Sequence, residues 1–288
     1  MLALAAGQEA AWIEPLLLPS LAVAMTLSTV SVTNRDLASI KSSPRPIFIS
    51  LLLNYLLMGG IMLLMARWPI NDSEIWAGFV TLAAMPPAIA VTPYSYMLGG
   101  DTIFSLIGTT GLYLVALGLT PAMIVLLLGA NSISPVRLLL ILVQLIAIPL
   151  AISRALLATG AAQNVIKWRD TAINWATFTT IYIIIGLNRQ VFFEQPGILF
   201  TVIIITVALT FGLGHAIDFT AKRLNIDPST RLSWIIMGTR KNTGLASVIA
   251  LASLGERATI PAAVLAMFAV LFIVWTSFYF KKTGQVNL

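Results

Sequence analysis

Two adjacent full charges, Arg240 and Lys241, stand in the middle of a stretch that is otherwise apolar. Asn242 and Thr243 follow them, so two cations, an amide and a hydroxyl group occur together where the surrounding pattern predicts a membrane helix. An Arg or Lys at the centre of a bilayer costs roughly 2.5 to 3.5 kcal/mol on insertion scales, so a chain keeps such a pair chiefly where it faces a water-filled cavity or a ligand. We therefore interpret residues 237–247 as the binding site of a membrane transporter.

The alternative for Arg240 and Lys241 is that both side chains snorkel to the membrane surface. They lie about ten residues into their apolar segment, roughly 15 Å from its start by helical rise, which favours a role inside the membrane. The two cations need not share that role, because one can face a substrate while the other pairs with backbone carbonyls. The planar guanidinium of Arg240 matches carboxylates, so we expect a small organic anion with an apolar body as the partner.

Composition excludes several other classes of protein. With 58% hydrophobic and 10% charged residues and a mean hydropathy of +0.94, the chain is an all-α polytopic membrane protein in contact with the lipid bilayer, not a soluble domain. Its formal charge of +6 is spread over short loops without a basic cluster, so no nucleic acid partner is expected. One His and no Cys leave little for a metal site or a nucleophile, so we expect no enzyme and no cofactor.

Apolar segments of about 20 residues predict nine transmembrane helices. They lie near 13–32, 46–66, 75–98, 102–128, 136–159, 170–187, 196–220, 230–254 and 259–280. Eleven of the 17 Lys and Arg residues fall in the connections on one side, four fall on the other, and the remaining two are Arg240 and Lys241. The positive-inside rule then predicts an outer N-terminus, an inner C-terminus and a multi-pass protein of the cell membrane.

The third and eighth predicted spans are both interrupted midway. Pro86 and Pro87 interrupt the third, whereas Gly238 and the polar residues through Gly244 interrupt the eighth, and each span ends in a glycine followed by an acidic residue. Broken helices in corresponding positions of two inverted repeats are the best sequence indication of a transporter site near the middle of the membrane. We expect these four residues to be the hinges of two broken helices.

Two motifs on these helices are familiar. They are Lys241-Asn242-Thr243-Gly244-Leu245-Ala246, and Met85-Pro86-Pro87 running through Gly100-Asp101 into Ser105 and Thr109. Both resemble motifs of the bile acid:sodium symporter family, and the resemblance covers nearly the whole chain in span order. It implies the nine-helix form of a ten-helix inverted-repeat fold, in which the two broken helices cross.

The resemblance also implies a division into two helix bundles. The panel bundle would contain the spans near 13–32, 136–159 and 170–187, and the core bundle those near 46–66, 75–128 and 196–280. Substrate would bind between the bundles, and the core would rock against the panel in an alternating-access cycle.

One sodium site of that family fits this chain poorly. The family uses a Ser-Asn pair on the first broken helix, Ser and Thr on the next helix, and Glu on the second broken helix. The matching residues here are Val91-Thr92, Ser105, Thr109 and Met237. Hydroxyl groups therefore remain, while the amide and the carboxylate are missing.

The other sodium site has a cationic residue in place of a ligand. The resemblance places Lys241 at the position of one Gln ligand and Asn54 at that of a second. Sodium needs several oxygen ligands, and a neighbouring ammonium repels it. We expect Lys241 to put its own cation where sodium would bind, which leaves coupling to protons or exchange open, because a buried Lys can exchange protons.

Other interpretations stay open at this stage. The protein can be a sodium-coupled symporter that uses the remaining hydroxyl ligands, or a membrane sensor or scaffold that transports nothing. Hydroxyl and amide side chains in membrane helices also bond to backbone or to a neighbouring helix, so Thr92, Ser105, Thr109 and Asn54 can have purely structural roles. Four residues of the first span are further candidates to face the substrate: Thr26, Ser28, Thr29 and Ser31. The spacing of Asp218 and Lys222 predicts an ion pair within one helix.

Overall fold

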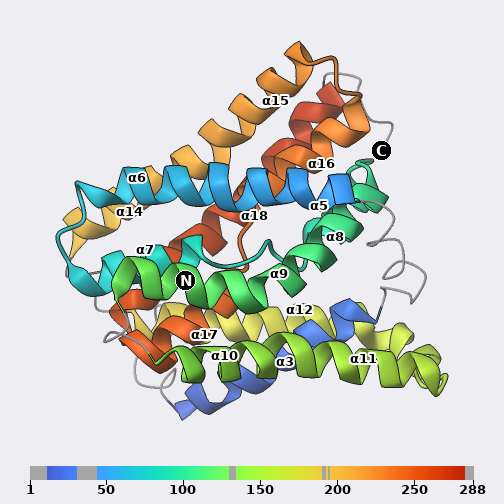
Figure 1. The fold of residues 1–288 in the computed structure, drawn as a ribbon, viewed down its shortest axis with the longest axis horizontal. Coiled ribbons are helices and arrows are strands. Elements are labelled where there is room, and N and C mark those ends of the chain that lie inside the picture. Colours follow the sequence, from blue (N-terminus) through green and yellow to red (C-terminus); the bar gives the residue numbers. More distant parts are fainter. Residues whose placement is uncertain (1–11, 31–43, 130–133, 190–192, 194, 283–288) are drawn as a thin grey trace.

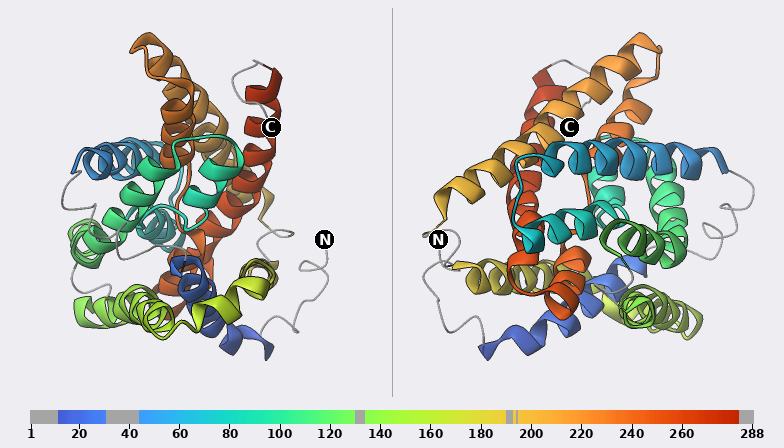
Figure 2. Two further views of the ribbon diagram at one scale, coloured as in Figure 1. Left: turned by 90° about the vertical axis from the view of Figure 1, so that its right-hand side faces the viewer. Right: turned by 60° about the vertical axis from the view of Figure 1, so that its left-hand side comes forward.

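The computed structural model describes residues 12–30, 44–129, 134–189, 193 and 195–282, and every element among them is a helix. The helices form two groups that lie on opposite sides of the bundle (Figures 1 and 2). The first group is the lower layer of Figure 1 and contains η1 (Glu14–Leu16), α3 (Leu17–Thr29), α10 (Pro135–Leu142), η3 (Val143–Ala147), α11 (Ile148–Ala158) and α12 (Ala162–Leu187). Within it α3 contacts both α11 and α12.

The second group contains the remaining helices. Its unbroken members are α5 (Pro44–Leu51) with η2 (Leu52–Gly59) and α6 (Gly60–Arg67), α9 (Thr102–Leu128), α14 (Pro196–Val207) with η4 (Ala208–Gly212) and α15 (Leu213–Arg223), and η5 (Arg257–Thr259) with α18 (Ile260–Lys282). The helix α5 packs against α9, and α14 packs against α18. Two broken helices lie among these members, in the centre of the molecule.

Each broken helix consists of two short halves. The first is made of α7 (Ser73–Ala83) and α8 (Val91–Met97), and the second of α16 (Pro228–Thr239) and α17 (Thr243–Leu254). Pro86 and Pro87 fall between α7 and α8, as predicted, because proline lacks the backbone N–H that a helix needs. The two interruptions cross, since the N–H of Asn242 donates to the carbonyl of Pro86 at 2.9 Å. As a result α7 packs against α17 and α8 against α16.

Glycines at the predicted turns allow each broken helix to lead straight into the next helix. Gly99 and Gly255 have φ angles of 75° and 107°, a backbone conformation that side chains other than glycine rarely adopt. Asp101 then caps α9, because its carboxylate accepts from the N–H of Phe104. The glycine-plus-acid signal in the sequence thus marks real turns.

Five helices of the described residues are long and apolar enough to cross a membrane. They are Pro44–Arg67, Thr102–Leu128, Pro135–Ala158, Pro196–Arg223 and Arg257–Phe280, and each matches a predicted span. The other four predicted spans match α3, α12 and the two broken helices. Those helices are shorter or more polar, so the nine-span topology and its orientation remain predictions.

The helix α12 contains the predicted span near 170–187 and begins earlier, at Ala162, with polar residues such as Lys167 on its exposed side. One expectation needs correction. The second interruption does not begin at Gly238, since α16 continues to Thr239. A Cβ atom on Gly238 would lie 2.5 Å from Cδ1 of Ile217, so this glycine allows α16 to pack closely on α15.

Asp218 joins three helices of the second group. Its Oδ2 accepts from Nζ of Lys222 at 2.6 Å and from the hydroxyl of Tyr279 at 3.1 Å, and its Oδ1 lies 2.9 Å from Nε of Arg231. The predicted Asp218–Lys222 pair is confirmed, and it is part of a larger cluster that links α15, α16 and α18.

Asp72 ties the beginning of α7 to the turn before α18. Its Oδ1 accepts from the N–H groups of Glu74 and Ile75 and so caps α7, while Oδ2 pairs with the guanidinium of Arg257. Arg257 also donates to Oε1 of Gln195 at 2.9 Å, just before α14. Burial alone would raise the pKa of Asp72, but these hydrogen bonds and the Arg257 charge outweigh burial and hold the pKa below its ordinary value of 3.8.

Replacing Asp72 tests this connection. We expect Asp72→Ala to lower the free energy of unfolding by about 1 kcal/mol through loss of the cap alone, whereas Asp72→Asn keeps a capping oxygen and loses the charge. Because the folded pKa is depressed, the stabilisation from the charge is present above pH 3.8 and is lost as the pH falls through the folded pKa. Thermal unfolding in detergent against pH measures both effects. Equal stability of all three proteins at neutral pH would contradict the prediction.

Candidate functional site

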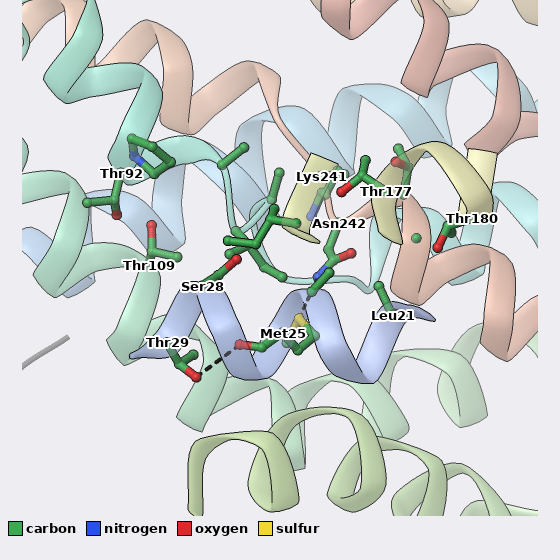
Figure 3. A pocket seen from close by; sticks show the side chains of 18 of the residues that line it. Leu21, Met25, Ser28, Thr29, Thr92, Thr109, Thr177, Thr180, Lys241 and Asn242 are labelled. Carbon is green, nitrogen blue, oxygen red and sulfur yellow. Dashed lines mark hydrogen bonds between the residues drawn. The ribbon is translucent and has the colours of Figure 1, made fainter. Parts of the chain in front are cut away.

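A cavity of about 790 Å³ lies between the two helix groups and reaches the crossing of the broken helices. Its wall comes from α3, α11 and α12 on one side and from α8, α9, α17 and α18 on the other. Most of the wall is apolar. Hydroxyl groups are spread over it, and Figure 3 shows Ser28 on α3 with Thr92, Thr109, Thr177 and Thr180 on other helices, while the hydroxyl of Thr29 donates to the carbonyl of Met25 on its own helix.

Lys241 lies at the crossing with its ammonium turned toward the first broken helix. Nζ donates to the carbonyls of Ala83 and Met85, both at 2.8 Å, and lies 4.4 Å from the ring centroid of Tyr55. These carbonyls belong to the end of α7, where helix geometry leaves acceptors without a partner and concentrates partial negative charge. The ammonium therefore donates hydrogen bonds to the unpaired carbonyls at the end of α7. Lys241 is only 2% exposed.

Asn54 performs the corresponding task for the second broken helix. Its Nδ2 donates to the carbonyls of Met237 at 3.1 Å and Arg240 at 2.8 Å, at the end of α16. The side chain is fully buried and does not line the cavity. Its contacts give Asn54 a structural role at the crossing instead of direct contact with a bound molecule.

Asn242 connects three segments at the same place. Its side-chain oxygen caps α17 by accepting from the N–H of Leu245, while Nδ2 donates to the hydroxyl of Tyr113 at 3.0 Å. That hydroxyl in turn donates to the carbonyl of Pro87 at 2.9 Å. Tyr113 is a site residue that was not predicted from the sequence, although a tyrosine hydroxyl in an apolar helix needs a partner and so is a usable signal.

Arg240 is the second buried cation, and it points elsewhere. Its guanidinium carbon lies 5.0 Å from the ring centroid of Tyr94, and the residue is 4% exposed. Nε and one terminal nitrogen have no hydrogen-bond acceptor among the described residues. Tyr94 lines the cavity whereas Arg240 does not, so the aromatic ring covers the guanidinium.

The structure separates the predicted site residues into two sets. Thr92, Thr109, Lys241, Asn242, Thr243 and Gly244 line the cavity, whereas Asn54, Ser105, Arg240 and Gly238 do not. Ser105 instead shares a hydrogen bond of 2.7 Å with the hydroxyl of Ser95, which joins α9 to α8. Among the candidates of the first span, Ser28 and Thr29 line the cavity, Thr26 bonds to its own helix, and Ser31 lies outside the described residues.

Acidic residues are scarce near the crossing. Within the described ranges, no group of three or more His, Asp or Glu residues could hold a metal ion. Asp170 is the acidic residue of the cavity wall, and its carboxylate lies 2.9 Å from Arg169. The electrostatics of the cavity near the crossing are therefore set by cations, hydroxyl groups and the positive start of α17.

Comparison with known protein families gives one match. Residues 18–195, more than half of the 288, match the Sodium Bile acid symporter family. The matched stretch includes the first broken helix and ends before the second, which carries Arg240 and Lys241. No curated protein matches the chain.

Replacing Lys241 tests whether its ammonium supports the crossing. Lys241→Met keeps the length of the side chain but leaves the carbonyls of Ala83 and Met85 without a donor, at a cost of about 1 to 3 kcal/mol for each buried group. We expect a clear drop in the unfolding temperature in detergent. Lys167→Met, on the exposed side of α12, should change it little. A Lys241→Met protein as stable as the wild type would contradict the role assigned to the ammonium.

Proposed function

The chain belongs to the sodium bile acid symporter family, and on that basis we propose that it is a secondary transporter that moves a small organic anion by alternating access. The family and the apolar helices make it a multi-pass membrane transporter and not an enzyme. The observation that carries the finer proposal is the cavity between the two helix groups, which ends at a crossing with two buried cations.

The lining of the cavity supports an anionic substrate with an apolar body. Thr243 and Gly244 begin α17 at the wall, where backbone N–H groups and the helix dipole favour negative charge. Ser247 and Thr109 add buried hydroxyl oxygens that have no partner among the described residues. Apolar side chains such as Met25 and Ile146 would pack against the rest of the substrate.

The contacts between the two groups support a rocking motion. In this proposal α3, α10, α11 and α12 form the panel, and the other helices form the core. The polar contacts between the groups include Asn242 to the sulfur of Met25 at 3.8 Å and Asn188 to Thr259 at 2.5 Å. The second contact lies at the end of α12 away from Arg169, so the groups are joined there while the cavity extends toward Arg169.

Sodium is not the coupling cation in this proposal. The ammonium of Lys241 already occupies the carbonyls at the end of α7, and any sodium ion placed there would be repelled. Thr92 and Thr109 keep their hydroxyl groups at the other family site, but Met237 brings a thioether where the family has a carboxylate. Hydroxyl oxygens without a carboxylate are weak support for a hard cation.

Transport in proteoliposomes tests the proposal directly. Labelled organic anions are offered to the purified protein in vesicles loaded with the same unlabelled anions, under sodium, potassium and pH gradients, with Lys241→Gln alongside. We expect saturable uptake of at least one anion, at a rate that does not change when potassium replaces sodium. Uptake driven by a sodium gradient would contradict the role of Lys241, and the absence of any flux would favour a sensor or scaffold.

A second experiment tests the location of the substrate. Ser28→Trp places a large ring in the cavity from α3, so uptake should fall to the level of protein-free vesicles. Val23→Trp is the matched control, because Val23 lies on the same helix, is 46% exposed and does not line the cavity. Equal uptake by the two variants would show that substrate does not pass between the helix groups.

A further inference from the structure

The positive charge at the crossing is not neutralised by any acidic side chain that the structure describes. The ion pairs of the described residues involve Asp72, Asp170 and Asp218, and none includes Arg240 or Lys241. Lys241 contacts two neutral carbonyls, and Arg240 contacts the ring of Tyr94. Both residues are at least nine-tenths buried, so bulk water screens their charge poorly.

This charge also cannot leave the protein. A bound sodium ion departs when a transporter releases its substrate, whereas the guanidinium of Arg240 is part of the chain. Arginine keeps its proton in proteins, so release of a proton cannot discharge it either. The core therefore carries the same fixed charge whether the cavity is occupied or empty.

An empty core and a loaded core then differ in how easily they change orientation. A buried charge without a partner is costly in a medium of low dielectric constant, and the cost falls when an opposite charge binds beside it. An anion in the cavity would supply that opposite charge, close to Lys241 and behind the ring of Tyr94 that covers Arg240. The core should therefore change its orientation quickly when an anion is bound and slowly when the cavity is empty.

We propose that the protein is an obligate anion exchanger, in which the fixed charge of Arg240 lets the core reorient only with an anion bound. The inference rests on the proposed function and specifies its coupling: one organic carboxylate or sulfonate enters as another leaves. No co-transported cation is needed, because the coupling charge is built into the second broken helix.

The test compares uptake into two kinds of proteoliposome. Both contain the purified protein, one loaded with unlabelled anion and the other with zwitterionic buffer, and the membrane potential is clamped. The probes are labelled benzenesulfonate, which stays charged and does not cross as a neutral acid, and labelled 2-hydroxy-4-methylpentanoate. Internal anion should accelerate uptake by roughly tenfold or more, which corresponds to about 1.4 kcal/mol in the barrier.

Variants of Arg240 test whether its charge sets the ratio of uptake into anion-loaded vesicles to uptake into buffer-loaded vesicles. Arg240→Gln keeps hydrogen-bond donors and removes the charge, so the ratio should fall toward one, whereas Arg240→Lys should preserve it. Arg67→Gln is the matched control, because Arg67 also lies over an aromatic ring, that of Trp76 at 5.7 Å, but is exposed. If Arg240→Gln does not fold, the uptake ratios of the wild type and of Arg240→Lys still decide whether reorientation requires a bound anion.

Each result has a definite meaning. A high ratio that only Arg240→Gln reduces supports the exchanger. Equal uptake into both kinds of vesicle overturns it while leaving transport intact, and so does net uptake into buffer-loaded vesicles driven by a pH gradient. If neither probe moves under any condition, while the purified protein remains folded, the proposed function fails and the exchanger fails with it.

Discussion

The structure depends on the contact between the ammonium of Lys241 and the carbonyls of Ala83 and Met85. Breaking a helix in the middle of an apolar bundle exposes backbone groups that lipid cannot satisfy, each at a cost of several kcal/mol. Lys241 donates hydrogen bonds to the backbone carbonyls at the end of α7, and Asn54 donates to those at the end of α16. With hydrogen bonds from these side chains at both helix ends, the two interruptions can cross inside the apolar bundle.

This arrangement also defines which parts can move together. Lys241 and Asn242 connect the second broken helix to the first, and Asn54 connects it to η2, so these segments form one unit. That unit lies close to α3, because a Cβ atom added to Gly244 would lie 3.0 Å from Cδ1 of Leu21, and its polar contact with α3 is the weak one of Asn242 with the sulfur of Met25 at 3.8 Å. Helices held by few polar bonds can slide past each other, which is what alternating access requires.

The second broken helix lies outside the stretch of this chain that matches the family. The match to the family covers residues 18–195 and does not extend to the helix that carries Arg240 and Lys241. In the proposed function, covalently attached cations stand where the family would bind sodium. The guanidinium of Arg240 cannot leave the empty site as a bound ion would, and this constraint is the basis of the proposed exchange.

Much of the fold follows from local patterns. Apolar segments, the Pro86-Pro87 pair and the turn glycines predict where helices begin, break and end, because hydrophobicity and backbone conformation are properties of neighbouring residues. The charged pair marked one interrupted helix for the same reason, whereas the crossing of the two broken helices was implied only by the family resemblance. Which carbonyls Lys241 contacts, why Ser105 pairs with Ser95 and why Tyr94 covers Arg240 depend on segments far apart in the chain: Asn54 and Arg240 are 186 positions apart. Such contacts are set by the direction of each side chain on its packed helix, so only the tertiary structure could assign them.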